Sequence, residues 1–360
     1  MKILKTEQFI NEQFSENQIL KYNLVYNEST GLYDCNGNVK VEKDLVSPDG
    51  KLIIKFGVVK GYFNCSDNKL TSLKGAPKEV GGYFDCSGNE LTSLEGVPQE
   101  VDGDFDCANN QLTSLESVPK EVGKDFRCGG NKLTSLEGAP QKVGGDFDCC
   151  YNQLTTLKGA PQKVGGDFNC HNNQLTSLEG APQVVGGDFD CRHNNQLTSL
   201  EGAPQKVGES FYCSSNKLTS LEGAPKEVGG GFYCYANQLI SLEGSPKKVG
   251  GDFYCYNNQL TSLKGSSQEV GGYFDCGGNK LTSLKGAPKE VGGNFDCSYN
   301  KLISLEGAPQ IVGGNFFCSQ NQFIYDEKHF YSLLPNVIGY DLEADDGCDY
   351  ELAKKYYRNC

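Results

Sequence analysis

Apolar side chains recur along most of this chain at fixed places in a short unit. Between residues 62 and 323 the pattern x-F-x-C-x-x-N-x-L-T-S-L-[EK]-G-A-P-x-x-V-G-G is repeated 13 times. Its cysteines lie 21 residues apart, with one step of 22, at Cys65, Cys86, Cys107, Cys128, Cys149, Cys170, Cys191, Cys213, Cys234, Cys255, Cys276, Cys297 and Cys318. Such regular repetition predicts a solenoid in which each copy forms one rung.

Within a rung, Phe and Cys stand two residues apart, so both point to the same face of a short strand. A single rung is too small to bury them. Rungs stacked in register bury each column of Phe, Cys, Leu and Val side chains as a continuous spine. We therefore predict a mostly β repeat solenoid with a parallel sheet of 13 rungs.

The polar and special positions predict the turns of each rung. The Asn column should turn the chain after each strand, its amides bonding backbone groups in their own turn and the next. Pro, present in 11 copies, favours an extended or polyproline-like back face. The Gly-Gly pair supplies backbone freedom before the next strand. We place the extra residue of the 22-residue step in the turn at 192–194.

The segment F-x-C-x-x-N-x-L matches the L-x-L-x-x-N-x-L half of the leucine-rich repeat. The whole unit resembles the short bacterial type of that repeat, as in the sensor domains of secreted bacterial ubiquitin ligases and in repeat arrays of phage genomes. Phe and Cys replace the usual aliphatic pair, and Gly-Gly lengthens the turn before the strand. The resemblance covers about three quarters of the chain. It implies a leucine-rich-repeat fold and a phage or bacterial origin.

A solenoid needs caps, because its terminal rungs would otherwise expose their spines. We predict an N-terminal cap over 1–60, with a helix over 1–20 and short strands that turn at Asn36-Gly37 and Asp49-Gly50. The solenoid itself occupies 61–323. A C-terminal cap over 324–360 has short helices at 326–334 and 350–357, and it either caps the last rung or docks a partner. This cap is too short to hold the catalytic domain of the ubiquitin ligases.

Composition narrows the function. A net charge of -13 disfavours binding to nucleic acid or to a membrane, because phosphate contacts require Lys and Arg. It suits a protein partner with a basic or mixed surface. The chain has neither the apolar core of a signal peptide nor the ~20 apolar residues of a membrane-spanning helix. We expect a cytoplasmic protein whose 17 cysteines stay reduced.

The copies differ mainly before Phe, between Phe and Cys, and at the two positions after Cys. The first three positions alternate with the buried pair and should form the exposed face of the sheet. There, rungs eight to ten are aromatic: Tyr212, Tyr233, Tyr235, Tyr254 and Tyr256. Rungs two to seven are acidic, although Arg127 and Arg192 interrupt them: Asp85, Asp104, Asp106, Asp125, Asp146, Asp148, Asp167, Asp188 and Asp190.

From these two zones we predict the partner-binding residues. They are the five tyrosines and seven of the aspartates: Asp104, Asp106, Asp146, Asp148, Asp167, Asp188 and Asp190. The alternative interpretation is that Asp is a soluble filler at exposed strand positions and that Tyr is present because strands favour it.

Catalytic and metal chemistry finds little support. The Cys column points inward in one line, so we interpret it as packing rather than as a zinc site. One exposed column could make a thiolate nucleophile or hold a metal: Cys150, His171 and Arg192, beside Asp148, Asp190 and His193. An exposed sheet, however, offers no pocket and no oxyanion hole. We predict no catalytic residue, no metal and no cofactor.

The leading hypothesis is a non-enzymatic protein-binding module, a phage or bacterial effector or inhibitor that binds a host or defence protein. Its tyrosines would anchor the partner and its aspartates would steer it. The alternative is an acidic mimic of nucleic acid that occupies the basic groove of a DNA- or RNA-binding protein. The strand spacing of ~4.8 Å is shorter than the phosphate spacing of DNA. A minor alternative is an enzyme centred on Cys150 and His171.

Overall fold

The computed structural model describes residues 16–323 and 336–337. These fall into two compact units, which we call the N-terminal unit (within 1–173 and 180–182) and the C-terminal unit (within 174–179 and 183–360). The helices predicted at 326–334 and 350–357, and most of the helix predicted at 1–20, lie outside the described residues. Within the described residues, no helix is long and apolar enough to cross a membrane.

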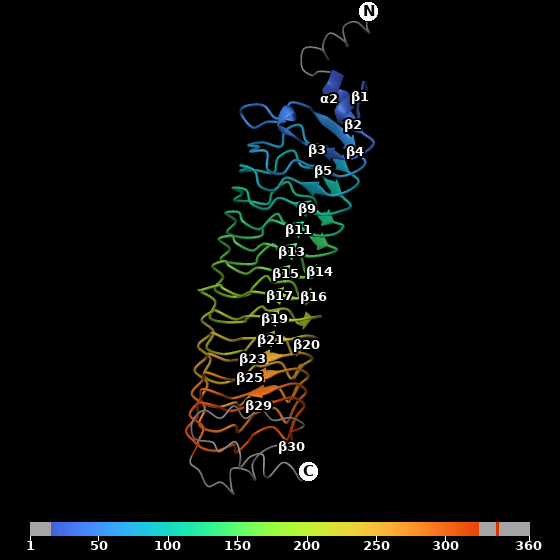
Figure 1. Cartoon of the computed structure of the whole chain (residues 1–360). Coiled ribbons are helices and arrows are strands. Elements are labelled where there is room, and N and C mark those ends of the chain that lie inside the picture. The colour runs from blue at the N-terminus through green and yellow to red at the C-terminus, as the bar shows by residue number, and fades with distance from the viewer. Residues whose placement is uncertain (1–15, 324–335, 338–360) are drawn as a thin grey trace, which may run out of the picture. The chain divides into compact units, whose positions relative to one another are not determined.

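In the N-terminal unit, the rungs carry two ladders of short strands (Figure 1). Helix α2 (Glu16–Lys21) and the 3-10 turn η1 (Lys43–Leu45) belong to the segment before the first regular rung. The first ladder opens with an antiparallel hairpin and continues in parallel: β1 (Leu24–Asn27), β2 (Leu32–Cys35), β4 (Phe56–Val59), β6 (Glu79–Val80), β8 (Glu100–Val101), β10 (Glu121–Val122), β12 (Lys142–Val143) and β14 (Lys163–Val164). The second ladder is parallel throughout: β3 (Val39–Lys40), β5 (Phe63–Asn64), β7 (Phe84–Asp85), β9 (Phe105–Asp106), β11 (Phe126–Arg127), β13 (Phe147–Asp148) and β15 (Phe168–Asn169).

The C-terminal unit repeats this arrangement with parallel strands only. Its first ladder consists of β16 (Val184–Val185), β18 (Lys206–Val207), β20 (Glu227–Val228), β22 (Lys248–Val249), β24 (Glu269–Val270), β26 (Glu290–Val291), β28 (Ile311–Val312) and β30 (Asn336–Val337). Its second ladder consists of β17 (Phe189–Asp190), β19 (Phe211–Tyr212), β21 (Phe232–Tyr233), β23 (Phe253–Tyr254), β25 (Phe274–Asp275), β27 (Phe295–Asp296) and β29 (Phe316–Phe317).

The back face was predicted to be extended or polyproline-like, and its pairing into a ladder of x-Val strands was not predicted. Proline lacks an N–H, but the residues after it keep theirs and can pair with a neighbouring rung. Lys142 pairs with Glu121, and Val143 pairs with Val122, in parallel register. Each regular rung therefore contributes one strand to each of two ladders.

The predicted spines are buried, which confirms the interpretation of the repeat. In one representative rung, Phe147, Cys149, Leu154 and Leu157 are fully buried. In both units the rings of the Phe column follow one another at centroid distances of 5.1 to 5.8 Å. The core is thus a set of parallel columns, in which each Phe ring lies against the Phe rings of adjacent rungs.

The Asn column is the main polar element inside the rungs. The Nδ2 of Asn152 donates to the carbonyls of Cys149 and Cys150 in its own rung, and to that of Cys128 in the preceding rung, at 3.1 to 3.3 Å. Its Oδ1 accepts the Leu133 N–H at 3.0 Å. The predicted hydrogen bonds from the Asn side chain to its own turn are confirmed. Its other backbone partners lie in the preceding rung, however, and not in the next one.

The 22-residue rung differs from its prediction. Asn194 lies three residues after Cys191, as Asn152 does after Cys149, and it donates to the Cys191 carbonyl at 3.0 Å. The turn at 192–194 therefore has the usual length. The extra residue follows Asn194, in an exposed turn at 195–196 that closes with a 2.8 Å bond from the Leu197 N–H to the Asn194 carbonyl.

At Gly165, the glycine after Val permits the close approach of neighbouring rungs rather than supplying backbone freedom. A Cβ at Gly165 would lie 2.0 Å from the carbonyl oxygen of Gly144 in the preceding rung. No real Cβ tolerates that distance, so a side chain here would push the rungs apart. Gly165 thus permits tight stacking of its rung on the preceding one at this corner, whereas Asp102 occupies the equivalent position in another rung.

Candidate interaction surface

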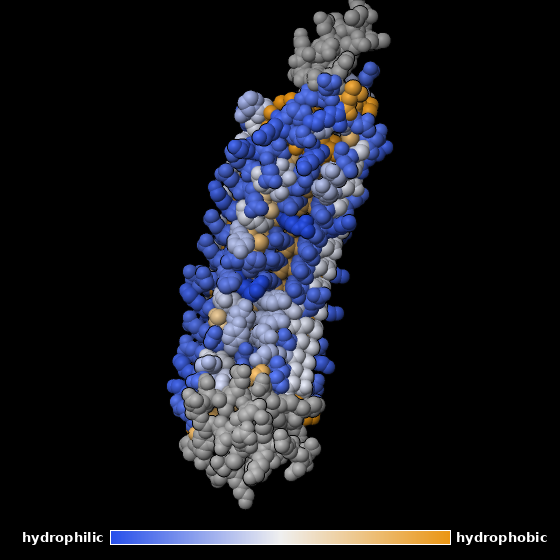
Figure 2. Space-filling model, viewed as in Figure 1, coloured by the Kyte–Doolittle hydropathy of each residue, from blue (hydrophilic) through white to orange (hydrophobic). Residues whose placement is uncertain are grey.

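The second ladder of the C-terminal unit carries a row of stacked tyrosines, which we call the tyrosine surface: Tyr212, Tyr233, Tyr235, Tyr254, Tyr256 and Tyr273. The rings of Tyr212 and Tyr233 stack at 4.6 Å and 8°, and those of Tyr235 and Tyr256 stack at 4.6 Å and 5°. The ring of Tyr254 stands across that of Tyr233 at 5.3 Å and 80°. All six are partly exposed. Figure 2 shows pale, weakly polar colouring over β19, β21 and β23, where this surface lies.

The sequence predicted five of these tyrosines and missed Tyr273. It lies in the column before Phe, whereas the other five lie between Phe and Cys or after Cys. Its ring stands across that of Tyr254 at 5.5 Å and 83°, and its hydroxyl donates to Asp296 Oδ2 at 3.2 Å. The sequence did contain a signal for Tyr273, because it lies only one rung after Tyr254 and two residues along the strand from the Tyr254 column.

Burial disfavours ionisation of most of the hydroxyls on this surface. Burial, with the nearby charge of Asp252, raises the pKa of Tyr254 to about 12. Burial also raises the pKa of Tyr212, Tyr233 and Tyr273. The surface therefore offers hydrogen-bond donors together with ring edges held in place by stacking.

The aspartates between Phe and Cys have a structural task that the sequence analysis did not foresee. In each, Oδ1 accepts the backbone N–H two residues later, as Asp106 does from Ala108 at 2.9 Å and Asp148 does from Cys150 at 2.9 Å. In the C-terminal unit Asp190 accepts the Arg192 N–H in the same way at 3.0 Å. These carboxylates fix the turn after each strand.

The aspartates before Phe connect rungs. Asp104 Oδ1 accepts the Asp125 N–H at 3.2 Å, and Asp146 Oδ1 accepts the Asp167 N–H at 2.8 Å. In the C-terminal unit, Asp188 Oδ1 accepts the Ser210 N–H at 2.7 Å. Both Asp columns therefore serve the fold, and their abundance requires no partner.

Two arginines offset part of the acidic charge. In the N-terminal unit, Arg127 pairs with Asp125 at 2.5 Å and approaches Asp104 at 3.9 Å. In the C-terminal unit, Arg192 pairs with Asp190 at 2.6 Å. The acidic zone predicted from the sequence is thus partly neutralised within the chain itself.

Asp106 retains a destabilising charge, and its removal is expected to stabilise the protein. Burial, with the charges of Asp85 and Asp148, raises the pKa of Asp106 to about 6, from an ordinary value of 3.8. The folded state therefore holds this proton more tightly than the unfolded state does, and stability is lost as the pH rises from about 4 to about 6. Asp106→Asn keeps the acceptor for the Ala108 N–H and should raise the free energy of unfolding at pH 7 by about 1–2 kcal/mol.

Urea unfolding at pH 4 and pH 7 tests this expectation. The gain should nearly vanish at pH 4, where the Asp106 carboxyl is protonated. Asn169 already occupies the same column, so asparagine fits the turn. Glu95→Gln, at an exposed position, removes one charge as a control. An equal gain at both pH values would show that the charge of Asp106 does not matter.

The buried thiols have the properties of packing groups. Desolvation holds the pKa of Cys128 and Cys149 well above the ordinary value, so these side chains stay neutral. No cysteine of the described residues forms a disulfide. Cys150 is only partly exposed, and the Nδ1 of His171 is hydrogen-bonded to Asn169. The ring of Tyr151 stands across the His171 ring at 5.2 Å.

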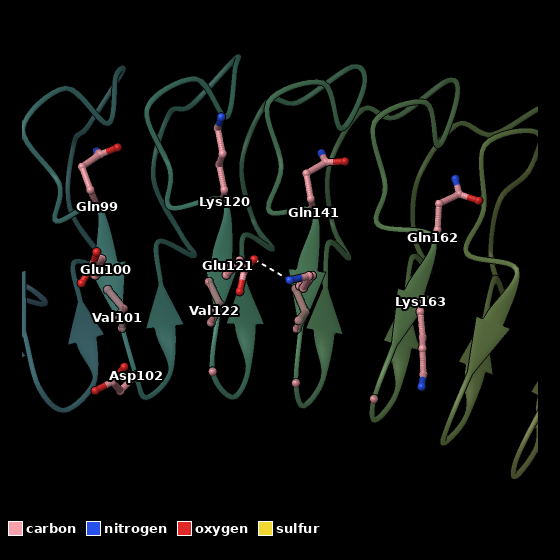
Figure 3. Close-up of a pocket in the computed structure, with 15 residues that line it drawn as sticks. Gln99, Glu100, Val101, Asp102, Lys120, Glu121, Val122, Gln141, Gln162 and Lys163 are labelled. Atoms are coloured by element: carbon pink, nitrogen blue, oxygen red, sulfur yellow. Dashed lines mark hydrogen bonds and ion pairs between the residues drawn. The ribbon is translucent and has the colours of Figure 1, made fainter.

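An open groove of about 940 Å³ runs along the first ladder of the N-terminal unit, which is formed by the x-Val strands (Figure 3). Its lining includes the buried Val101, Val122 and Val143, together with a row of Gln and Lys side chains. Glu121 and Lys142 pair across adjacent strands at 2.6 Å. The groove carries charges of both signs, with Glu100 and Glu121 in its earlier rungs and Lys142 and Lys163 in its later ones.

No family model and no curated protein matches the chain. It is similar to the solved structure of YopM from Yersinia enterocolitica WA-314, with 18% identity, a TM-score of 0.50, and 87% of this chain and 80% of that one covered. It is also similar to the leucine-rich repeat domain of APL1, with 14% identity, a TM-score of 0.56, and 89% and 94% covered. For the leucine-rich repeat domain of APL1B the identity is 18% and the TM-score is 0.51, and the match covers 76% of this chain and 83% of that one. Together with the stacked rungs, these likenesses show that the chain has the leucine-rich-repeat fold.

Proposed function

We propose that this protein is a non-enzymatic module that binds another protein through the tyrosine surface of the C-terminal unit. The observation that carries the proposal is the stacking of Tyr212 on Tyr233 and of Tyr235 on Tyr256 at a partly exposed face. Tyrosine is enriched among the residues that dominate protein–protein binding energy. Rings already fixed by stacking lose little conformational entropy when a partner binds.

The structure supports the tyrosines more strongly than the aspartates as the anchors of this surface. The Asp columns have structural bonds, such as the one from the Ala108 N–H to Asp106. Their repetition therefore follows from the turn, with or without a partner. This also removes the main argument for a nucleic-acid mimic, which rested on an acidic ladder without another purpose. The tyrosine row has no comparable structural need, because other rungs hold Asp, Asn or Ser at the same positions.

The double variant Tyr233→Ala/Tyr254→Ala tests the proposal. Each anchor should contribute about 2 kcal/mol to binding, so the double variant should lose about 4 kcal/mol and its dissociation constant should rise by about 1,000-fold. The partner is first captured from the native host by the intact chain and identified by mass spectrometry. Its affinity for each variant is then measured by surface plasmon resonance.

A matched control is available in the N-terminal unit. Tyr62 and Tyr83 also stack, at 4.5 Å and 8°, so Tyr62→Ala/Tyr83→Ala removes the same amount of aromatic surface elsewhere. This control should keep full affinity, and circular dichroism should show both variants folded. Binding that survives the loss of Tyr233 and Tyr254 would overturn the proposal.

A further inference from the structure

The groove along the first ladder of the N-terminal unit holds one row of exposed charged side chains, which we call the charge row: Glu100, Glu121, Lys142 and Lys163. Each of them directly precedes a buried valine of one column: Val101, Val122, Val143 and Val164. These valines pair in parallel register from strand to strand. The four charges therefore follow one another along adjacent rungs, about 4.8 Å apart.

The charge row changes sign at its midpoint, between Glu121 and Lys142, which pair with each other at 2.6 Å. Glu100 and Lys163 lie at opposite ends of the groove (Figure 3) and form no ion pair with any residue that the structure describes. Within each half of the row, like charges occupy adjacent strands, which costs stability. Opposite charges supplied by a bound partner would offset this repulsion and pair both ends of the row.

Such a row is complementary to itself. If a second copy of the chain is rotated by half a turn about an axis through the midpoint, perpendicular to the ladder, its basic half faces the acidic half of the first copy. Glu100 of each copy then faces Lys163 of the other, and Glu121 of each copy faces Lys142 of the other. Two surfaces related in this way form the symmetric contact of a two-fold dimer, in which every pair occurs twice.

The groove also has no net charge, in contrast to the chain as a whole. Its remaining charged lining residues, Asp102 and Lys120, are of opposite sign, so its acidic and basic groups balance. The chain has a net charge of -13, which makes two copies repel each other in general. A second copy that approaches through this groove instead meets a neutral surface whose charges match its own.

We propose that the groove is a self-association surface, through which two copies of the chain bind each other by the opposed halves of the charge row. Glutamate and lysine side chains are long, and all four are exposed, so they reach across an open groove to a facing copy. The charge pattern identifies the partner. A foreign protein would need the same change of sign at the same spacing, whereas a second copy always carries it.

The contact is expected to be weak, because four rungs offer little area and small interfaces are transient. The groove lies on a different ladder and in a different unit from the tyrosine surface, so this inference does not depend on the proposed function. A dimer would nevertheless carry two tyrosine surfaces. Two linked sites bind a partner that has two matching sites more tightly than either site does alone.

Sedimentation velocity of the intact chain tests the inference. Between about 10 and about 300 µM protein, at about 150 mM salt, the sedimentation coefficient should rise from that of one chain toward that of two. Glu100→Lys sets lysine against Lys163 at both ends of the contact and should weaken the association by about tenfold or more. Adding Lys163→Glu to this variant restores opposite charges at both ends and should bring the affinity back to within about threefold of the intact chain.

Two further variants change the whole charge row. Lys142→Glu/Lys163→Glu makes the row entirely acidic, and Glu100→Lys/Glu121→Lys makes it entirely basic. Each variant alone should remain monomeric, because every facing pair has the same charge. Their equimolar mixture should associate at least as tightly as the intact chain, since every facing pair is then opposite in charge.

The matched control is Glu95→Lys/Glu116→Lys, which makes the same change in charge at exposed positions of another column and should associate like the intact chain. Circular dichroism should show that all variants are folded. The inference is overturned if the intact chain stays monomeric over this range, if Lys163→Glu does not rescue Glu100→Lys, or if the mixture fails to associate. Tyr233→Ala/Tyr254→Ala should associate like the intact chain, so a failure of the proposed function leaves this inference standing.

Discussion

Asn152→Ala is expected to lower the free energy of unfolding by about 3–5 kcal/mol, since it leaves several buried backbone groups without partners. The Asn152 amide accepts from the Leu133 N–H at 3.0 Å and donates to the carbonyls of Cys128 and Cys149 at 3.1 Å. Alanine can replace none of these bonds, and Asn152 is 8% exposed, which leaves little room for water. Urea unfolding followed by circular dichroism measures the change.

The neighbouring Gln153 gives the control, because its side chain is exposed. Gln153→Ala should change the free energy of unfolding by less than about 0.5 kcal/mol. Asn152→Asp keeps an acceptor for the Leu133 N–H but loses both amide donors and brings a charge inside, so it should be no more stable than Asn152→Ala. If Asn152→Ala proved as mild as Gln153→Ala, the Asn column would not support the stacking of the rungs.

Phe147→Ala is expected to cost about 3–5 kcal/mol, the usual range for deleting a buried phenylalanine. The Phe147 ring is fully buried, and its centre lies 5.2 Å from those of Phe126 and Phe168. The cavity cannot close easily, because backbone bonds such as Phe147 N–H to the Asp167 carbonyl at 2.7 Å hold the rungs at a fixed spacing. Thermal and urea unfolding both report the loss.

Phe147→Leu separates the loss of volume from the loss of the aromatic column. Leucine fills most of the space, so this variant should cost about 1–1.5 kcal/mol. A cost as large as that of Phe147→Ala would mean that ring stacking, rather than filled volume, dominates the spine. A negligible cost for Phe147→Ala would show that the Phe column does not stabilise the stacked rungs.

The spines could be predicted because a buried column leaves the same residue type in every rung. Phe147, Cys149 and Leu154 are each one member of such a column, and all are fully buried. The first ladder, formed by the x-Val strands, was missed for the opposite reason. Its strands are only two residues long, as in Lys142–Val143, and one of the two is exposed, so no alternation identifies a strand.

The surface was predicted less completely than the core. The tyrosine row stood out because it departs from the neighbouring rungs, and it remains the candidate for binding. The role of the aspartates was missed because the sequence shows only that a residue is Asp. It does not show whether that Asp accepts a turn N–H or simply lies exposed on the surface. Asn64 and Asn169 in the Asp106 column were the available signal, since asparagine shares the acceptor but not the charge.

The long rung shows where this architecture can change length. Although Phe189 and Phe211 are 22 residues apart, they remain paired in register, as are Asp190 and Tyr212. The added residue bulges outward at 195–196, on the corner after Asn194. A codon gained at this corner by slippage during replication would therefore leave the strands in register, and every exposed strand residue would keep its place on the same face. One gained within a strand would turn every later residue of that strand to the opposite face.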